Sequence, residues 1–399
     1  MIRVKTTRFI TSKKDLNRLF QYNRTSAQVW NDCLDHARAH HKQNGKWINK
    51  SQLQKHTKKQ YQLHSQSIQA VCHKYLWARE NTKKARDQGH TNIRYPWRKK
   101  KNYNTKWAKD GFTIEPNGRI ELSLGIWQGK RQAPIVVFVK SLPAGCVKEL
   151  ELIYDRGLKL AISYDDGLAP KKNNSTNAAA IDLGEIHSIA AVSNAGAGII
   201  ITGRKLRSLK RLRNKKQQEL QRLIACYKKG SRQWKKYRRA LNYILSKSDA
   251  QLRDALHKTT RQFVRWCLEN NIQSVVVGDV EGVQRHTSKR NKRNKDRKQI
   301  RSRKHNQRMS QWQFGKLHDY LKYKLEAEDI SIKKVSESYT SQTCPVCGRR
   351  KKVTGRVYMC HCGYKEHRDI HGAKNILTKH LYLEMRQIEV GEIKYLRIA

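Results

Sequence analysis

Four cysteines near the C-terminal end of the chain have the spacing of a metal site. Cys344 and Cys347 are three positions apart and are followed by a glycine, and Cys360 and Cys362 come after twelve further residues. Two thiolates three positions apart in a tight turn can bind one side of a tetrahedral ion. We therefore predict one structural Zn²⁺, held by all four cysteines.

The second half of this motif does not settle the identity of the fourth ligand. Cys360 and Cys362 form a Cys-x-Cys pair, whereas Cys-x-x-Cys is the usual spacing. Cys362, which precedes a glycine, is the firmer candidate. Either His361 or His367 could replace Cys360 as the fourth ligand.

Two aspartates stand where carboxylate chemistry could occur. Asp182 follows the apolar stretch AAAI and precedes a tight turn, and Asp369 precedes the helix-like segment IHGAKNIL. Each alone is more typical of a turn or of a helix start. Together with a third acid they would suit two-metal phosphodiester cleavage, in which several carboxylates hold a pair of Mg²⁺ ions.

The charge of the chain indicates a nucleic-acid partner. Lys and Arg number 85 against 32 Asp and Glu, so the formal net charge is +53. Phosphate backbones neutralise such a surplus. The charge is not gathered on one amphipathic helix, which argues against a membrane surface. No apolar run is long enough to span a bilayer and no signal peptide opens the chain. We expect a cytoplasmic protein of a prokaryote, associated with the nucleoid while it acts.

Hydrophobic periodicity divides the chain into segments. A short strand opens it, residues 11–91 have helical spacing, and residues 92–165 read as short strands that fit a small barrel. The polar tract 171–177 reads as a linker. A hairpin of small apolar residues follows, then a basic helix at about 204–229 capped by Gly230, two further helices and the buried strand SVVVG. The composition of the basic stretch 284–308 is equally consistent with a disordered loop and with a nucleic-acid clamp.

The motifs, taken in order, resemble one family. IDLG, SVVVGDVEG, NQRMSQWQF, ESYTSQTCPVCG and HRDIHGAKNIL are similar to segments of the TnpB (OrfB) family, transposon-encoded RNA-guided DNA nucleases related to the compact type V CRISPR effectors. The resemblance is dense over 178–377 and looser over 1–175. It implies an α+β multidomain fold with an N-terminal wedge β-barrel, an inserted helical recognition lobe, and a RuvC-like (RNase H-type) α/β domain interrupted by a zinc ribbon.

The resemblance also implies domain boundaries. We expect the wedge barrel at 1–10 and 92–175, the recognition lobe at 11–91, and the RuvC-like nuclease domain at 176–342 and 363–378. The zinc ribbon would occupy 343–362 and a C-terminal tail 379–399.

The middle acid of the expected catalytic triad departs from the family pattern. Many members have a glutamate at the end of the buried strand, where this chain has Gly278, with Asp279 and Glu281 just beyond. In some members the glutamate lies instead in a segment like ESYTSQTC, which here contains Glu337. We therefore expect Asp182, Glu337 and Asp369 to bind two Mg²⁺ ions, and Glu281 is the less favoured alternative.

The resemblance implies an RNA-guided DNA endonuclease of a transposon. Its partners would be a guide RNA derived from the transposon end and a target DNA, cut next to a short flanking motif. Two alternatives are a nuclease-dead RNA-guided DNA-binding protein and an RNase H-fold transposase that acts without RNA. The intact acids argue against the first, and the ribbon and basic helix argue against the second.

Overall fold

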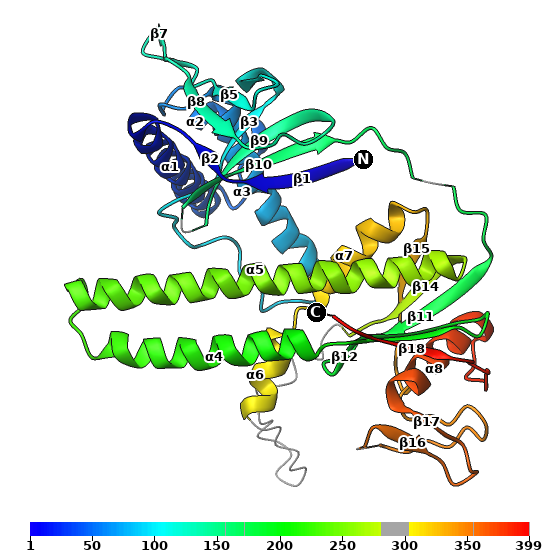
Figure 1. Ribbon diagram of the computed structural model, residues 1–399. Coiled ribbons are helices and arrows are strands. Elements are labelled where there is room, and N and C mark those ends of the chain that lie inside the picture. Colours follow the sequence, from blue (N-terminus) through cyan, green and yellow to red (C-terminus); the bar gives the residue numbers. More distant parts are fainter. Residues whose placement is uncertain (156, 171, 281–302, 354, 399) are drawn as a thin grey trace. The chain divides into compact units, whose positions relative to one another are not determined.

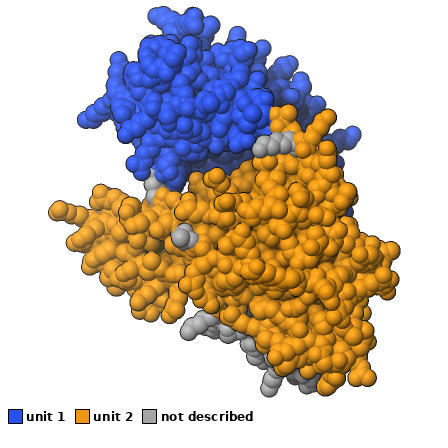
Figure 2. Space-filling model, turned by 45° about the vertical axis from the view of Figure 1, so that its right-hand side comes forward, with its two compact units in different colours: residues 1–168 blue, residues 169–399 orange. Residues whose placement is uncertain are grey.

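The computed structural model describes residues 1–155, 157–170, 172–280, 303–353 and 355–398, with side chains omitted for 303–306. The chain divides into two compact units, residues 1–168 and 169–399 (Figure 2). Each unit has its own hydrophobic core, so each is described separately. No helix in the described part of the chain has the length and apolar character needed to cross a membrane.

The first unit contains the expected helical segment. Its helices are α1 (Lys13–Asn44), α2 (Lys50–Thr57) and α3 (Ser65–Asp87) (Figure 1). The side chain of Ser12 accepts a hydrogen bond from the backbone N–H of Asp15, which satisfies a donor at the start of α1. The helices bury one apolar face against the strands of the same unit.

The strands of the first unit pair as two four-stranded sheets. One sheet has the order β1-β10-β9-β3 and the other β2-β8-β5-β4. Their bounds are β1 Ile2–Thr7, β2 Phe9–Ile10, β3 Thr105–Ala108, β4 Phe112–Ile114, β5 Arg119–Leu122, β8 Ile135–Val139, β9 Cys146–Tyr154 and β10 Leu158–Asp165. A small hairpin, β6 (Ile126–Trp127) and β7 (Lys130–Arg131), stands apart from both. The strand segments expected between 92 and 165 are therefore present.

The second unit is built on a six-stranded mixed sheet of order β15-β14-β11-β12-β13-β18. The strands are β11 (Asn177–Asp182), β12 (His187–Ser193), β13 (Gly198–Thr202), β14 (Ile272–Gly278), β15 (Ser331–Val335) and β18 (Ile393–Arg397). β11, β12 and β13 form an antiparallel meander, and β14 and β15 add in parallel beside β11.

Both faces of this sheet are covered, because alternate residues of each central strand point to opposite sides. Ala179 and Ile181 of β11 join the core beneath α5 (Arg232–Glu269) and α7 (Phe314–Glu326). Ala178 and Ala180 face the other way, toward α8 (Arg368–Tyr382). The small side chains let α8 pack close to the sheet.

The basic region after the meander differs from the sequence expectation. α4 (Arg204–Ala225) has Cys226 as its C-cap, so Gly230 is not its cap and lies instead, with φ of +92°, in the turn before α5. The two helices expected next are a single helix, α5, which packs antiparallel to α4 as a long hairpin (Figure 1). No proline interrupts residues 232–269, so local sequence alone does not break the helix.

The C-terminal region also differs. The ribbon hairpin, β16 (Val357–Met359) and β17 (Lys365–His367), leads directly into α8, which runs past residue 378. Residues 379–399 were expected to form a tail, but β18 pairs in parallel with β13 and closes one edge of the sheet. The segment is too short to show periodicity, and only pairing with a distant strand gives it structure.

Candidate active site and cysteine cluster

Asp182 is the last residue of β11, and it lies at the end of the sheet where the neighbouring parallel strands also terminate. β11 pairs in parallel with β14, with Ile181 opposite Val277. β14 pairs in parallel with β15, with Gly278 opposite Val335. The carboxyl ends of three adjacent strands therefore meet, which is a common position for polar groups that bind ligands.

Gly278 and Glu337 also lie at this end of the sheet. Glu337 follows β15 by two residues, and its Oε2 would lie 2.6 Å from a Cβ atom built on Gly278. Real Cβ atoms do not approach so closely, so the Glu337 side chain occupies the space that a side chain at 278 would need. β14 has no acid at its own end, but Glu337, which follows the neighbouring strand β15, places a carboxylate beside it.

Asp369 approaches from the helix that covers this face of the sheet. It lies in the first turn of α8, where an acidic side chain is favoured by the helix dipole. The same helix carries Gly372, whose hypothetical Cβ would lie 2.4 Å from Oδ2 of Asp182. A glycine at this position therefore lets the helix pass directly over the Asp182 carboxylate.

The three acids act on one another electrostatically. Burial, together with the negative charges of Asp369 and Glu337, raises the pKa of Asp182 to about 8, although the positive charge of Arg368 opposes this shift. Burial likewise raises the pKa of Glu337 to about 7, with a contribution from the carboxylate of Asp279. Carboxylates crowded in this way are stabilised when a cation is bound among them.

Asp369 differs because it has histidine partners. Burial alone would raise its pKa, but a hydrogen bond with His187 and the charges of His187, His367 and Arg368 leave the pKa below its ordinary value. Nδ1 of His187, the first residue of β12, lies 2.6 Å from Oδ2 of Asp369. Neither histidine was predicted in this role. His367 was considered only as a zinc ligand, and nothing in the local sequence around His187 identifies its partner.

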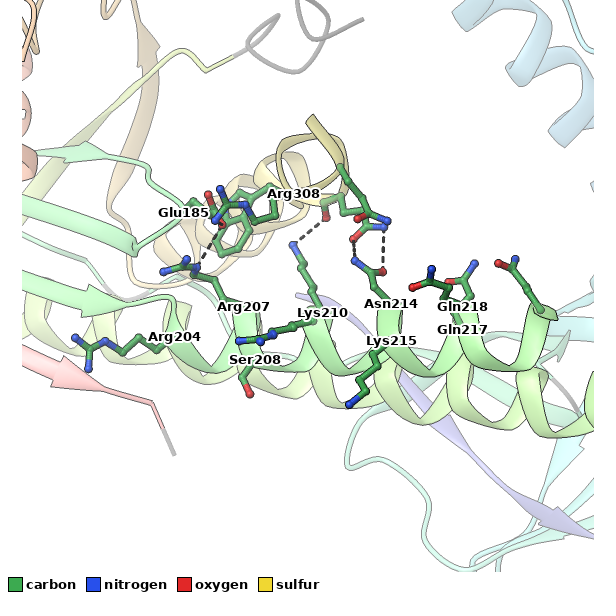
Figure 3. Close-up of a pocket in the computed structure, with 15 residues that line it drawn as sticks. Glu185, Arg204, Arg207, Ser208, Lys210, Asn214, Lys215, Gln217, Gln218 and Arg308 are labelled. Carbon is green, nitrogen blue, oxygen red and sulfur yellow. Dashed lines mark hydrogen bonds and ion pairs between the residues drawn. The ribbon is translucent and has the colours of Figure 1, made fainter. Parts of the chain in front are cut away.

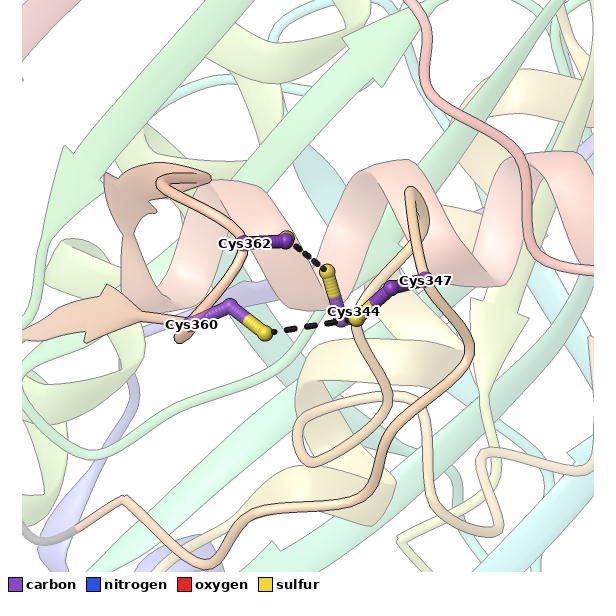
Figure 4. A group of neighbouring side chains, drawn as sticks. All are labelled: Cys344, Cys347, Cys360 and Cys362. Carbon is purple, nitrogen blue, oxygen red and sulfur yellow. Dashed lines mark hydrogen bonds between the residues drawn. The ribbon is translucent and has the colours of Figure 1, made fainter.

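The four cysteines do come together. Their Sγ atoms all lie within 4.8 Å of one another, with 3.6 Å between those of Cys344 and Cys362 and 3.5 Å between those of Cys347 and Cys360 (Figure 4). This tight group of thiols can hold a metal ion, and the donor set suits Zn²⁺. Cys360 belongs to it, and His367 belongs to a separate group.

The cluster is attached to the helix that carries Asp369. The side-chain amide of Asn375 in α8 donates hydrogen bonds to the carbonyls of Thr340 and Thr343, just before the first cysteine. Tyr358 of β16 stacks on His371 of α8, with 3.9 Å between ring centroids. The ribbon therefore supports the N-terminal part of α8.

A basic groove of about 1070 Å³ lies along α4 and α6 (Arg303–Gln311) (Figure 3). Its single acidic side chain, Glu185, pairs with Arg207 and Arg308. Nζ of Lys210 donates to the carbonyl of Gln311 and lies 4.0 Å from the ring centroid of Trp312, so α4 is tied to the end of α6. The remaining lining residues carry basic, amide or hydroxyl groups: Arg204, Ser208, Arg211, Asn214, Lys215, Gln217, Gln218, Gln221 and Gln307.

Glu281 and most of the basic stretch 284–308 lie outside the described residues, although α6 includes the end of that stretch. Asp279 is exposed, and its backbone N–H donates to the carbonyl of Val335.

Comparison with known proteins gives two family matches. Residues 159–284 match a model described as "Probable transposase" of the OrfB type, and residues 314–376 match the "Cas12f1-like, TNB domain". A TnpB-like protein of Methanocaldococcus jannaschii is 23% identical over 248 residues, which is 61% of this chain and 82% of that protein. A protein of Paramecium bursaria Chlorella virus 1 described as a transposase is 41% identical over 66 residues, 16% of this chain and 15% of the viral protein.

Among solved structures, the fold is similar to that of Cas12f1 in its complex with sgRNA and target DNA. The TM-score is 0.63 at 14% identity, and the match covers 92% of this chain and 83% of that one. This likeness concerns the α+β fold alone. With both family models matching in the expected order and a TnpB-like homologue aligned over most of its own length, the chain is a TnpB-family relative of the type V effectors.

Proposed function

We propose that this chain is a transposon-associated RNA-guided DNA endonuclease. In this proposal it binds a guide RNA derived from the transposon end and cuts target DNA next to a short flanking motif. The family matches support the transposon association, and the Cas12f1 structure, which holds sgRNA and target DNA, supports guided recognition as the working hypothesis.

The observation that carries the proposal is the position of Glu337. Its carboxylate lies where a side chain on Gly278 would lie, at the end of the strand next to that of Asp182. A third acid, Asp369, interacts with Asp182 electrostatically. These observations support a site formed by acids from three segments far apart in sequence, which is the kind of site that phosphodiester cleavage with metal ions requires.

The site fits Mg²⁺ in its chemistry, because carboxylate oxygens are the ligands that this ion prefers. Asp182 and Glu337 would hold the ions, and binding would offset the burial and the neighbouring negative charges that raise their pKa values. Bound Mg²⁺ would activate the attacking water and stabilise the leaving oxygen. Asp369 would be the third ligand, with its carboxylate oriented by His187.

The basic groove would bind the phosphate backbone of RNA or of the guide–target duplex. Arg204, Arg211 and Lys215 line it and form no side-chain ion pair within the described residues. Arginine and lysine contacts to phosphate position a nucleic acid without reading its sequence. Sequence would then be read by base pairing with the guide.

One Zn²⁺ in the four-cysteine cluster would have a structural role. All four positions of a tetrahedral ion would be filled by thiolates, which leaves none for water or substrate. Its contribution to function would be to fix the ribbon and, through Asn375, the start of α8.

Two measurements test the proposal. RNA that copurifies with the protein is sequenced, and the protein–RNA complex is then assayed for cleavage of matching DNA at fixed Mg²⁺. Asp182→Asn, Glu337→Gln and Asp369→Asn should each abolish cleavage and preserve RNA and target binding. Each substitution replaces a charged carboxylate ligand with a neutral amide of nearly the same shape. Binding without cleavage by the unmodified protein would favour a nuclease-dead RNA-guided binder.

The middle acid needs its own comparison. Glu337→Ala and Glu281→Ala are assayed side by side on guided target DNA. Loss of cleavage in Glu281→Ala but not in Glu337→Ala would move the middle acid to the segment after β14. If neither variant loses cleavage, Asp279 is the next ligand to test.

A transposase that acts without RNA is the second candidate, because the matching model over residues 159–284 is described as a transposase. This reading predicts that nuclease-treated, RNA-free protein still cuts or joins transposon-end DNA. The guided endonuclease predicts that RNA removal abolishes cutting and that added guide RNA restores it.

A further inference from the structure

His187, His367 and Asp369 form a compact group of potential metal ligands beside the three acids. One ligand atom from each lies within 4.8 Å of the others. His187 comes from the start of β12, His367 from the end of β17, and Asp369 from the first turn of α8. Strand, ribbon and helix thus converge, and none of the three residues belongs to the cysteine cluster.

The chemistry of this group differs from that of the other acids. Asp182 and Glu337 offer oxygen alone, whereas this group offers two imidazoles and one carboxylate. Imidazole nitrogen favours first-row transition-metal ions, and Mg²⁺ prefers all-oxygen surroundings. Two histidines and one carboxylate are a set that such ions accept with further positions left open.

The polar atoms of the group are only partly satisfied. Nδ1 of His367 is buried and has no hydrogen-bond partner among the described residues. A buried imidazole nitrogen without a partner is costly unless a water or an ion satisfies it. The His187 side chain is 5% exposed, and its ring centroid is 5.2 Å from that of His367. The His367 ring is therefore held next to a possible co-ligand.

The contact between His187 and Asp369 is slightly shorter than the separation that a bound ion needs. Their facing atoms, Nδ1 and Oδ2, are 2.6 Å apart, which is hydrogen-bonding distance. Adjacent ligand atoms of an ion with bonds of about 2.1 Å are roughly 3 Å apart. A small opening of this contact makes room for a cation between the two residues.

We propose that His187, His367 and Asp369 bind one first-row transition-metal dication, so that this chain takes up Mn²⁺ in preference to Mg²⁺ at this position. The site shares Asp369 with the proposed nuclease centre but requires neither guide RNA nor DNA cleavage. It gives the centre a nitrogen-containing metal position that Asp182 and Glu337 alone would not provide.

Mn²⁺ is the probe for the test, because its electron paramagnetic resonance reports both free ion and bound nitrogen. The full-length protein is prepared with Zn²⁺ in its cysteine cluster and with nucleic acid removed, since phosphates bind Mn²⁺ themselves. Titration measures the loss of the free-ion signal, and pulsed measurements detect modulation by imidazole ¹⁴N. We expect one tight Mn²⁺ per chain that shows imidazole modulation and that at least a tenfold excess of Mg²⁺ fails to displace.

Variants separate ligation from positioning. His187→Ala and His367→Ala should each weaken Mn²⁺ binding tenfold or more and reduce the nitrogen modulation. His187→Gln keeps a donor that can reach Asp369 but removes the imidazole, and it should also lose affinity. His380→Ala, an exposed histidine on the same α8, is the matched control and should bind like the unmodified protein. Circular dichroism verifies that each variant is folded.

The outcomes distinguish this inference from the proposed function. Absence of nitrogen modulation, or unchanged binding in folded His187→Ala and His367→Ala, overturns the metal site. Full affinity in His187→Gln would make His187 a hydrogen-bond partner of Asp369 only and would also overturn it. Tight Mn²⁺ binding in a protein that cuts no DNA would leave the metal site standing and reject the endonuclease alone.

Discussion

Glu337 fills the space that a side chain on Gly278 would occupy. Oε2 of Glu337 would lie 2.6 Å from a Cβ on Gly278, and Cδ1 of Ile376 would lie 3.1 Å from it. Glycine at 278 and glutamate at 337 are therefore complementary: the first has no side chain, and the second supplies a carboxylate at the same place.

Gly278→Ala should reduce Mg²⁺-dependent cleavage much more than it reduces stability. The added methyl forces the Glu337 side chain out of its present position, whereas the backbone at 278 has no left-handed φ that would add strain. Overpacking of this kind typically costs about 1–3 kcal/mol. Cleavage rates and chemical denaturation are measured together. Unchanged cleavage in a folded Gly278→Ala variant would show that the Glu337 position is not important for catalysis.

The complementarity can also be reversed. In a Glu337→Gly background, Gly278→Glu places a carboxylate on the end of β14, in the space that Glu337 leaves. We expect the double variant to recover part of the cleavage that Glu337→Gly loses. Gly278→Gln in the same background is the matched control, because it restores volume without the negative charge and should recover none.

Cys344→Ser should release the structural zinc. The unmodified protein should contain about one Zn²⁺ per chain, and loss of one of four thiolates should lower both zinc content and unfolding temperature. Cys146→Ser is the control, because Cys146 is exposed and lies outside the cluster. Metal analysis and thermal unfolding are the measurements. Full zinc and full stability in Cys344→Ser would reject the four-cysteine assignment.

Lys210 should make the unfolding free energy depend on pH in the alkaline range. Burial lowers the pKa of its ammonium group from 10.5 to about 8. Between these values the unfolded chain binds more protons than the folded one, so the unfolding free energy rises with pH through this window. The rise should approach about 3 kcal/mol.

Denaturation of the unmodified protein and of Lys210→Met from pH 7.5 to 10.5 tests this expectation. The stability of the unmodified protein relative to the variant should increase across the window. Lys258→Met, which removes an exposed positive charge on α5, controls for the general effect of net charge. Parallel curves for the unmodified protein and Lys210→Met would contradict a lowered pKa.

The basic groove should contribute to the salt dependence of RNA binding. Arg211→Gln with Lys215→Gln removes two charges that line it. Each lost phosphate contact lowers the slope of log K against log salt by roughly 0.7–0.9, so the slope should fall by about 1.5. Lys258→Gln with Lys322→Gln removes two exposed lysines of α5 and α7 that do not line the groove, and should change the slope less. Equal slopes for the two double variants would reject the groove as a binding surface.

Features set by neighbouring residues could be read from the sequence. The spacing of Cys344, Cys347, Cys360 and Cys362 predicted a cluster that the structure contains. The strands β11, β12 and β14 were likewise predicted, because apolar patterning involves residues close in sequence. The predictions were wrong for segments whose structure depends on distant partners, as β18 and the undivided α5 show.

The sequence by itself therefore determined the kinds of elements, the cysteine cluster and the basic character of the chain. Only the tertiary structure decided that Glu337 lies beside Gly278 and that His187 holds Asp369 across 182 positions of sequence. The physical reason is that local hydrogen bonding and apolar spacing act within a few residues. The meeting of two distant side chains depends instead on strand order and on how closely α8 packs over the sheet, which no local pattern records.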